Sequence, residues 1–161
     1  MLTSSEIAAN YTLIRVMTLN DWPAVLLMAE AMHAESAYCG TEFSAERVKE
    51  TFRGLVDQEH GITFIAEVKG EVVGMFIGYV TRHFFSDELL AQDLVTYIVP
   101  EHRKGTLAFG LVNAYTQTAT RLNVSMIQLG ATSGTENDRV AQLFSRLGYE
   151  RSGTVLRRKP V

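Results

Sequence analysis

The chain has 161 residues, of which 47% are hydrophobic and 20% charged, and its formal net charge is −3. This size and composition predict one compact domain over residues 1–161, because domains commonly contain about 100–200 residues. The slightly acidic balance argues against a nucleic-acid partner, since nucleic-acid-binding domains gather Lys and Arg on one face.

Cysteine and histidine usage narrows the class of protein further. The single cysteine, Cys39, cannot form an intramolecular disulfide, and we find neither a charged-then-apolar leader nor an apolar run of about 18 residues. These features predict a cytoplasmic protein without a membrane partner. The four histidines, His33, His60, His83 and His102, lack the spacing of metal ligands, so no metal is expected.

The N-terminal half predicts a strand, two helices and a hairpin. Residues 12–17 alternate in polarity as a strand does, and residues 20–23 resemble a helix start with proline in the first turn. Ser44 is expected to cap the second helix. Residues 62–80 predict a β-hairpin whose two-residue turn is Lys69-Gly70.

The C-terminal half alternates strands and helices. The predicted elements are a buried strand over 89–99, a long helix over 104–122, a strand over 124–129, a helix from Thr135 to Gly148, and one or two strands over 149–156. The whole order predicts an α/β fold, in which about four helices flank a central mixed β-sheet with parallel and antiparallel pairs.

The segment from Val99 to Ala108 is the first candidate site, because it passes from the buried strand directly into a helix. Small residues let an anion approach the backbone, and the first N–H groups of a helix have no internal partner. Arg103 and Lys104 add positive charge. Neither G-x-x-x-x-G-K-[ST] nor G-x-G-x-x-G is present, which disfavours nucleotide and dinucleotide loops.

This segment resembles the pyrophosphate-binding motif of the GNAT superfamily of N-acetyltransferases: Arg or Gln, two residues, Gly, one residue, then Gly or Ala. Arg103 and Ala108 match its ends, Thr106 replaces its central Gly, and Gly105 stands one place early. A second segment resembles the family's Asn-x-x-Ala-x-x-Leu-Tyr-x-x-x-Gly-Phe signature. Its matching residues are Asn137, Leu143, Phe144, Leu147, Gly148 and Tyr149.

The resemblance implies a GNAT-like fold that binds acetyl-coenzyme A. Backbone N–H groups would hold the pyrophosphate at residues Arg103, Lys104, Gly105, Thr106, Leu107 and Ala108. The main chain of Ile98 and Val99 would pair with the pantetheine arm, and Asn137 would contact the cofactor from the next helix. Asn137 is otherwise interpreted as a helix-start residue that satisfies its neighbours.

Acetyl transfer by direct attack in a ternary complex needs a donor for the developing oxyanion, a base and an acid. Val99 N–H is the predicted oxyanion donor. Asp93 is the only carboxylate within residues 89–99 and is the predicted base, with a solvated strand-end aspartate as the alternative and with Asp87 and Glu88 as weaker candidates.

The proton donor is the open question in this mechanism. The family's usual acid is a tyrosine where this chain has Phe144, which we interpret as a wall against the cofactor or as core. Tyr149, Tyr97 or water would assist instead, although core packing is the default for both tyrosines.

The resulting hypothesis is an N-acetyltransferase that acts on a primary amine of unknown identity, either a small molecule or a protein amino group. The alternative is a coenzyme A-binding or interaction module with weak or no catalysis, which Thr106 and Phe144 favour. A third interpretation is an α/β adaptor that binds no cofactor. The apolar pairs Phe84-Phe85 and Leu89-Leu90, with the resemblance, also make a homodimer a hypothesis.

Overall fold

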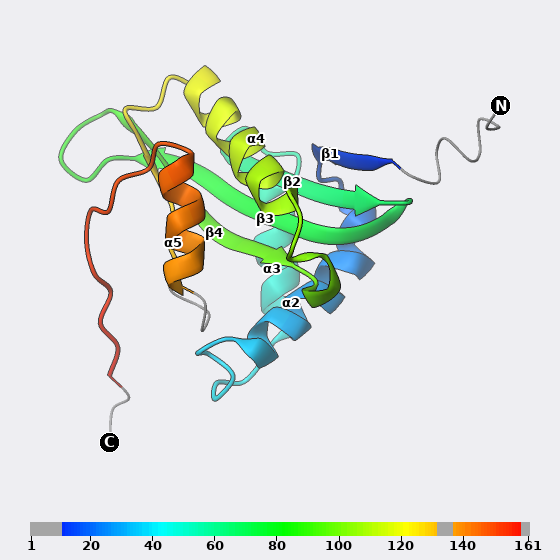
Figure 1. The fold of residues 1–161 in the computed structure, drawn as a ribbon. Coiled ribbons are helices and arrows are strands. Elements are labelled where there is room, and N and C mark those ends of the chain that lie inside the picture. The colour runs from blue at the N-terminus through cyan, green and yellow to red at the C-terminus, as the bar shows by residue number, and fades with distance from the viewer. Residues whose placement is uncertain (1–10, 132–136, 159–161) are drawn as a thin grey trace, which may run out of the picture.

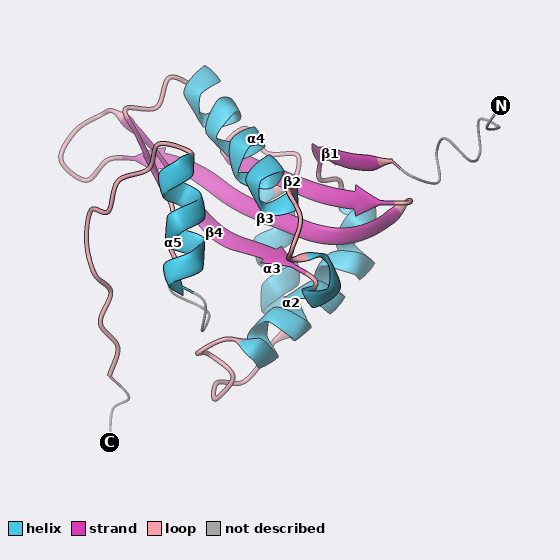
Figure 2. Ribbon diagram, viewed as in Figure 1, coloured by secondary structure: helices cyan, strands magenta, loops and turns pink. Residues whose placement is uncertain are grey.

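A mixed sheet lies between two pairs of helices (Figures 1 and 2). The structure, a computed structural model, describes residues 11–131 and 138–158 and the backbone of Asn137. Within that part of the chain the sheet runs β1-β2-β3-β4-β5, and its single parallel pair is β4 with β5. The strands are β1 (Thr12–Val16), β2 (Gly61–Val68), β3 (Glu71–Arg82), β4 (Leu89–Ile98) and β5 (Met126–Gln128).

The helices cover opposite faces of this sheet, as predicted for a mixed α/β fold. One face carries α2 (Trp22–Glu35) and α3 (Ala45–Leu55), and the other carries α4 (Leu107–Arg121) and α5 (Asn137–Arg146). Two short 3-10 turns, η1 (Leu19–Asp21) and η2 (Pro100–His102), precede α2 and α4.

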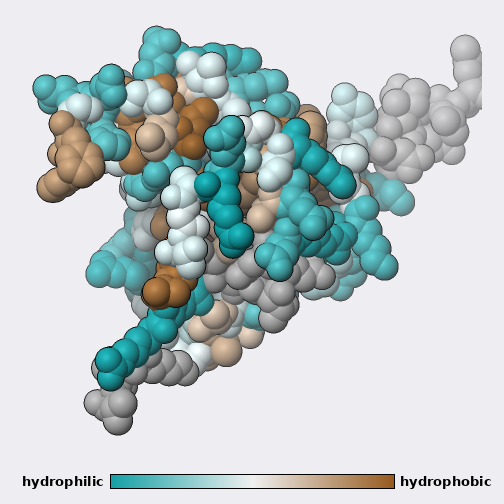
Figure 3. Space-filling view, turned by 60° about the vertical axis from the view of Figure 1, so that its left-hand side comes forward, coloured by the Kyte–Doolittle hydropathy of each residue, from teal (hydrophilic) through white to brown (hydrophobic). Residues whose placement is uncertain are grey.

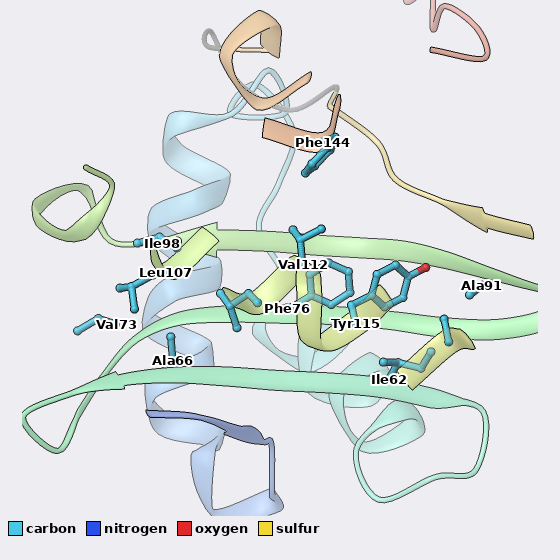
Figure 4. Packing of buried hydrophobic residues seen from close by; sticks show 12 residues of the cluster. Ile62, Ala66, Val73, Phe76, Ala91, Ile98, Leu107, Val112, Tyr115 and Phe144 are labelled. Atoms are coloured by element: carbon cyan, nitrogen blue, oxygen red, sulfur yellow. The ribbon is translucent and has the colours of Figure 1, made fainter. Parts of the chain in front are cut away.

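Each face of the sheet has its own apolar core, because neighbouring strand residues point to opposite sides. In β3, Met75 packs in the cluster beneath α2 and α3, whereas Phe76 packs in the cluster beneath α4. Phe76 stacks on Tyr115 of α4 with ring centroids 4.4 Å apart (Figure 4). Both rings are fully buried, so α4 is fixed firmly against the sheet.

Most predicted elements are present, with local chemistry as expected. Ser44 Oγ accepts a hydrogen bond from the Arg47 N–H at 3.3 Å and caps α3. Lys69 and Gly70 both have positive φ, 54° and 81°, as a two-residue hairpin turn requires. α4 begins at Leu107 rather than Lys104, because η2 and a short turn come first. The predicted start of the last helix at Thr135 lies outside the described residues.

The final strand predicted over residues 149–156 is wrong. Residues 149–158 form no strand, and Val155 and Leu156 are 66% and 89% exposed. A strand needs a partner for its N–H and C=O groups, and β5, the edge strand on this side, has only three residues. Alternation of polarity therefore cannot by itself make this segment extend the sheet.

The β4 strand contains a β-bulge that opens the sheet. Asp93 pairs with Gly78 and Val95 with Ile77, so Leu94 has no partner on β3. Gly78 is needed here, because a Cβ would lie 2.9 Å from the Gln92 carbonyl oxygen. β5 pairs only with residues 90–92 of β4. From Asp93 to Ile98, β4 therefore has an edge with no partner strand among the described residues, which we call the open edge of β4.

Candidate active site at the open edge of β4

The turn before α4 leaves the N-terminus of that helix accessible. Lys104, Gly105 and Thr106 are exposed, and the Thr106 side chain makes no capping hydrogen bond. Leu107 is buried and anchors the first turn of the helix to the core. Uncapped N–H groups and the helix dipole together favour an anion at this position. The geometry fits the phosphate-binding role that the sequence predicts for residues 103–108.

The Arg103 side chain points away from this turn and toward α2. Its Nε donates to the Ile98 carbonyl oxygen at 2.8 Å, and its Nη2 donates to Glu35 Oε2 at 2.6 Å. The guanidinium also lies over the Tyr97 ring, 5.2 Å from the centroid. Tyr97 completes the set by donating its hydroxyl to Glu35 Oε1 at 2.7 Å. We call Glu35, Tyr97 and Arg103 the α2 clasp.

The α2 clasp holds each of its members in one protonation state. Burial raises the pKa of Glu35, but hydrogen bonds from Tyr97 and Arg103 outweigh it and leave that pKa lowered. Burial lowers the pKa of Arg103, but the hydrogen bond and the charge of Glu35, with smaller contributions from Tyr97, together outweigh burial and leave that pKa raised. Burial, then the bond to Glu35, raises the pKa of Tyr97 to about 12. Carboxylate, guanidinium and neutral phenol therefore coexist at neutral pH.

The main chain of Val99 does not face the open edge. Its N–H donates to the Val73 carbonyl oxygen at 2.9 Å, and its carbonyl accepts from the His102 N–H at 3.0 Å. The predicted roles of Val99, as oxyanion donor and as a pairing partner for pantetheine, conflict with these bonds. Because successive strand residues direct their peptide groups to opposite edges, the N–H groups of Ile98 and Thr96 face the open edge instead.

Thr96 is a candidate that the sequence analysis missed. Its Oγ1 is the one buried side-chain N or O atom without a hydrogen-bond partner among the described residues. Thr96 pairs with Phe76, so its side chain lies on the α4 face of β4, between Asp93 and Ile98. An unsatisfied buried hydroxyl costs about 1–3 kcal/mol, which a bound ligand would recover. The available hint was a hydroxyl residue inside the apolar run 89–99.

Asp93 lies where β4 and β5 part, and its side chain is partly buried. Its Oδ1 accepts the Gly130 N–H at 2.8 Å, which ties β4 to the segment after β5. Burial raises the pKa of Asp93 to about 6, with the Gly130 hydrogen bond acting in the opposite direction. Such a carboxyl can take up and release a proton near neutral pH, unlike a solvated strand-end aspartate.

Tyr149 is positioned by the end of α5. Gly148 has a φ of 88°, and the Tyr149 N–H bonds back to the Phe144 carbonyl at 3.1 Å, as in a Schellman motif. The two rings then pack with centroids 6.1 Å apart. Phe144 itself is 6% exposed and belongs to the α4 core (Figure 4), so both the wall and the core interpretations of Phe144 fit its position.

The Tyr149 hydroxyl lies 2.7 Å from Thr116 Oγ1 on α4. Thr116 already donates its hydrogen to the Val112 carbonyl at 2.8 Å, so Tyr149 is the donor in this pair. Burial raises the pKa of Tyr149, and the charge of Asp93 raises it further. Burial, with smaller contributions from the charges of Tyr149 and Asp93, also raises the pKa of Tyr115.

The other predicted residues lie away from the open edge or beyond description. Asp87 and Glu88 belong to the exposed connection between β3 and β4, where Asp87 pairs with Arg82 at 3.3 Å. Asn137 begins α5, and its side chain lies outside the described residues. Within the described part of the chain, no three His, Cys, Asp or Glu side chains gather as a metal site, and no helix has the length and apolarity needed to cross a membrane.

The remaining surface offers two further features. A pocket of about 250 Å³ lies beside α2 and α3, on the opposite side of the sheet from α4, and is lined by Leu19, Trp22, Lys49, Phe52 and Arg53. Phe84 and Phe85, in the connection between β3 and β4, are 91% and 84% exposed. Figure 3, turned by 60° from the view of Figure 1, shows apolar atoms protruding at its left edge.

Comparison with known proteins identifies the family. Residues 28–149 match the profile of the acetyltransferase (GNAT) family, and the chain therefore belongs to that family. In this member of the family, the sheet opens beside β4, and α4 starts after the end of that strand. Among curated protein sequences, none matches the chain significantly.

Solved structures share the fold at low sequence identity. AAC(6')-Iy bound to a coenzyme A bisubstrate analogue is 15% identical, with 94% of this chain and 100% of that chain covered and a TM-score of 0.73. A ribosomal-protein-alanine N-acetyltransferase from Brucella melitensis biovar Abortus 2308 is 16% identical, with 92% of this chain and 99% of that chain covered and a TM-score of 0.69. A transcriptional regulator from Bacillus halodurans C-125 is 17% identical, with 92% of this chain and 99% of that chain covered and a TM-score of 0.74.

Proposed function

We propose that this protein is an N-acetyltransferase that passes the acetyl group of acetyl-coenzyme A to a primary amine by direct attack in a ternary complex. The observation that carries the proposal is the continuity of two backbone surfaces that present N–H groups. The open edge of β4 leads, through η2, to the uncapped N-terminus of α4. One surface suits an amide-bearing arm, and the other suits its phosphates.

Three features support a fit to acetyl-coenzyme A. The N–H groups at the start of α4 are accessible to a pyrophosphate, with exposed Lys104 beside them. The N–H of Ile98 faces the open edge, as the pairing predicted for Ile98 requires. Thr96 Oγ1 is buried without a partner on the same face. AAC(6')-Iy, of the same fold, was solved with a coenzyme A bisubstrate analogue.

Acetyl-coenzyme A, when bound, supplies the thioester that the amine attacks. In this proposal the Ile98 N–H and the Thr96 hydroxyl are the donors nearest the reacting carbonyl, in place of Val99. Asp93 accepts the ammonium proton, directly or through water, because a pKa of about 6 leaves it ionised above neutrality. Tyr149 reaches the same neighbourhood, but it donates its hydrogen to Thr116 and has a raised pKa, which makes it a weak acid.

The acceptor is proposed only as an amine. The fold neighbours include aminoglycoside acetyltransferases and a ribosomal-protein-alanine N-acetyltransferase, so a screen should include aminoglycosides, small amines and N-terminal peptides. We propose that residues 36–43, which follow α2, contribute to the acceptor site, because the Glu35–Arg103 pair ties the end of α2 to the turn before α4.

Calorimetric titration with acetyl-coenzyme A tests the cofactor site. Gly105→Asp places a carboxylate at the start of α4, where a Cβ meets only the His102 carbonyl oxygen at 4.0 Å. The matched control is Gly54→Asp, on exposed α3 with nothing within 4 Å of the new Cβ. We expect micromolar binding in the wild type and the control, and a loss of at least about tenfold in Gly105→Asp, from repulsion of the phosphates. Absence of binding in the wild type would refute the proposal.

A coenzyme A-binding module with little catalysis is the second candidate. It is favoured by Phe144, which has no proton to donate, and by a Tyr149 hydroxyl already committed to Thr116. The two functions separate in a thiol-release assay with the amine panel. Saturable acetyl-coenzyme A binding without amine-dependent thiol release would identify the module, whereas amine-dependent release identifies the enzyme.

A further inference from the structure

The α2 clasp links two parts of the site that are far apart in the sequence. Glu35 is the last residue of α2, and Arg103 is the first residue of the turn that opens α4. Their side chains meet at 2.6 Å, although 68 positions separate them. Tyr97, near the end of β4, bonds to the same carboxylate. Three elements therefore converge on one carboxylate.

The same clasp closes the turn between β4 and α4. Arg103 Nε donates to the carbonyl of Ile98, the last residue of β4, so the guanidinium bridges from within the connection back to its beginning. Stacking over the Tyr97 ring fixes the plane of the guanidinium. A bridge of this kind restricts the conformations of the connection that carries the first N–H groups of α4, and preorganisation of a binding site favours binding.

We propose that Glu35 is a positioning residue for the phosphate-binding turn, acting through Arg103 and never touching the cofactor. The inference rests on the proposed function, because it assigns residues that shape the proposed cofactor site. It also makes the end of α2, and the acceptor-side segment 36–43 that follows, part of the machinery that orders the cofactor turn.

Electrostatic repulsion alone predicts a change in acetyl-coenzyme A affinity opposite in direction to the change that the proposal predicts, so an experiment can distinguish the two. A carboxylate near a phosphate site repels the ligand, and it also occupies an arginine that would otherwise be available to the phosphates. Removing the charge of Glu35 should therefore strengthen acetyl-coenzyme A binding if charge dominates. If the clasp holds the turn, the same change weakens binding, because the bridge from Arg103 to α2 is lost.

The experiment compares four variants by titration with acetyl-coenzyme A. Glu35→Gln should weaken binding about five- to tenfold, as expected for the loss of one contact between coupled residues. Glu30→Gln, on the exposed side of the same helix, removes the same charge and should leave binding unchanged. Tyr97→Phe keeps the ring under Arg103 and loses the bond to Glu35, so its effect should be smaller.

The fourth variant, Arg103→Met, completes a double-mutant cycle with Glu35→Gln. If Glu35 acts through Arg103, adding Glu35→Gln to Arg103→Met should change the affinity less than twofold. Additive losses would overturn the inference. So would tighter binding by Glu35→Gln with a steeper salt dependence, because Arg103 would then have turned to the phosphates.

Hydrogen exchange of the ligand-free proteins separates this inference from the function that it rests on. The amides of residues 104–107 should exchange faster in Glu35→Gln than in the wild type and Glu30→Gln. If the wild type binds no acetyl-coenzyme A, the proposed function fails, and the exchange result still decides whether the clasp orders the turn. Equal exchange in all three proteins would refute the clasp as a positioning device.

Discussion

The two ends of the open edge of β4 are built on different principles. At the α4 end, the side chains are fully engaged with one another and the backbone N–H groups are left accessible. At the β5 end, a carboxylate is partly buried with a single backbone donor from Gly130, and its pKa is shifted to about 6. The first arrangement is suited to holding a ligand of fixed charge, and the second to changing its own charge.

This contrast indicates how one strand can serve both binding and chemistry. Paired charges such as Glu35 and Arg103 keep their ionic forms over a wide pH range. An incompletely compensated acid such as Asp93 is destabilised in its charged form and is therefore close to titration. If the contrast is correct, changes at the β5 end should alter rate and pH dependence, whereas changes at the α4 end should alter affinity.

The largest effect is expected from Asp93→Asn. The amide oxygen can still accept the Gly130 N–H, but it cannot take up a proton, so kcat/KM should fall by about 100-fold or more. Wild-type activity should rise with pH through about 6, the Asp93 pKa, and the variant should lose that acidic limb. Steady-state rates from pH 5 to 8 check this. An unchanged pH profile would remove Asp93 from the mechanism, provided that acetyl-coenzyme A still binds equally.

Stability provides a second test of the same residue. The pKa of Asp93 is about 6 in the folded state, above its unfolded value of 3.8. The protonated side chain therefore contributes to the free energy of unfolding below pH 4, and this contribution is lost as the pH rises to 6. Asp93→Asn should therefore be more stable than the wild type at pH 8, by on the order of 2 kcal/mol. Denaturant unfolding at pH 4 and pH 8 measures the difference. Equal gains at both pH values would show that burial of charge is not the cause.

Thr96→Val tests the role of the hydroxyl in the middle of the open edge. Valine has nearly the same shape and no hydroxyl, so removal of the unsatisfied Oγ1 should raise the unfolding free energy by about 1 kcal/mol. The same change should lower kcat several-fold, because a ligand partner is lost. Thr96→Ser is the control that keeps the hydroxyl. Greater stability with unchanged turnover would mean that Thr96 only packs.

The smallest effect is expected from Tyr149→Phe. The ring would keep its contact with Phe144, and Thr116 would lose only an additional donor, since it already bonds to Val112. We expect a change in kcat of less than about threefold, because a coenzyme thiolate with a pKa of about 8.5 leaves readily without an acid. A loss of about 100-fold, with cofactor affinity intact, would instead make Tyr149 the general acid.

Local patterns in the sequence carried much of the fold. Within the described residues, periodicity located the four helices and the strands of the sheet, and Ser44, Lys69-Gly70 and Gly148 act as the cap, turn and terminator that their chemistry predicts. These features depend on residues a few positions apart. The anion-binding role proposed for residues 103–108 rests on a local feature of the same kind, because a turn that opens a helix is defined by its own backbone.

Long-range pairing determined what local patterns did not reveal. Whether a strand persists at residues 149–156 depends on a partner edge, and β5 offers only three residues. The direction of the Val99 N–H depends on its register with Val73, and the direction of the Arg103 side chain depends on a carboxylate 68 positions earlier. The orphan hydroxyl of Thr96 and the raised pKa of Asp93 exist only after burial.

The sequence by itself thus predicted most of the elements, their order and the position of the proposed anion-binding turn, because each depends on short-range sterics and hydrogen bonding. Only the tertiary structure shows which groups along β4 already have hydrogen-bond partners and which do not. The physical reason is that hydrogen-bond partners and desolvation are properties of neighbours in space, and a neighbour such as Glu35 enters the site only when α2 packs against the end of β4.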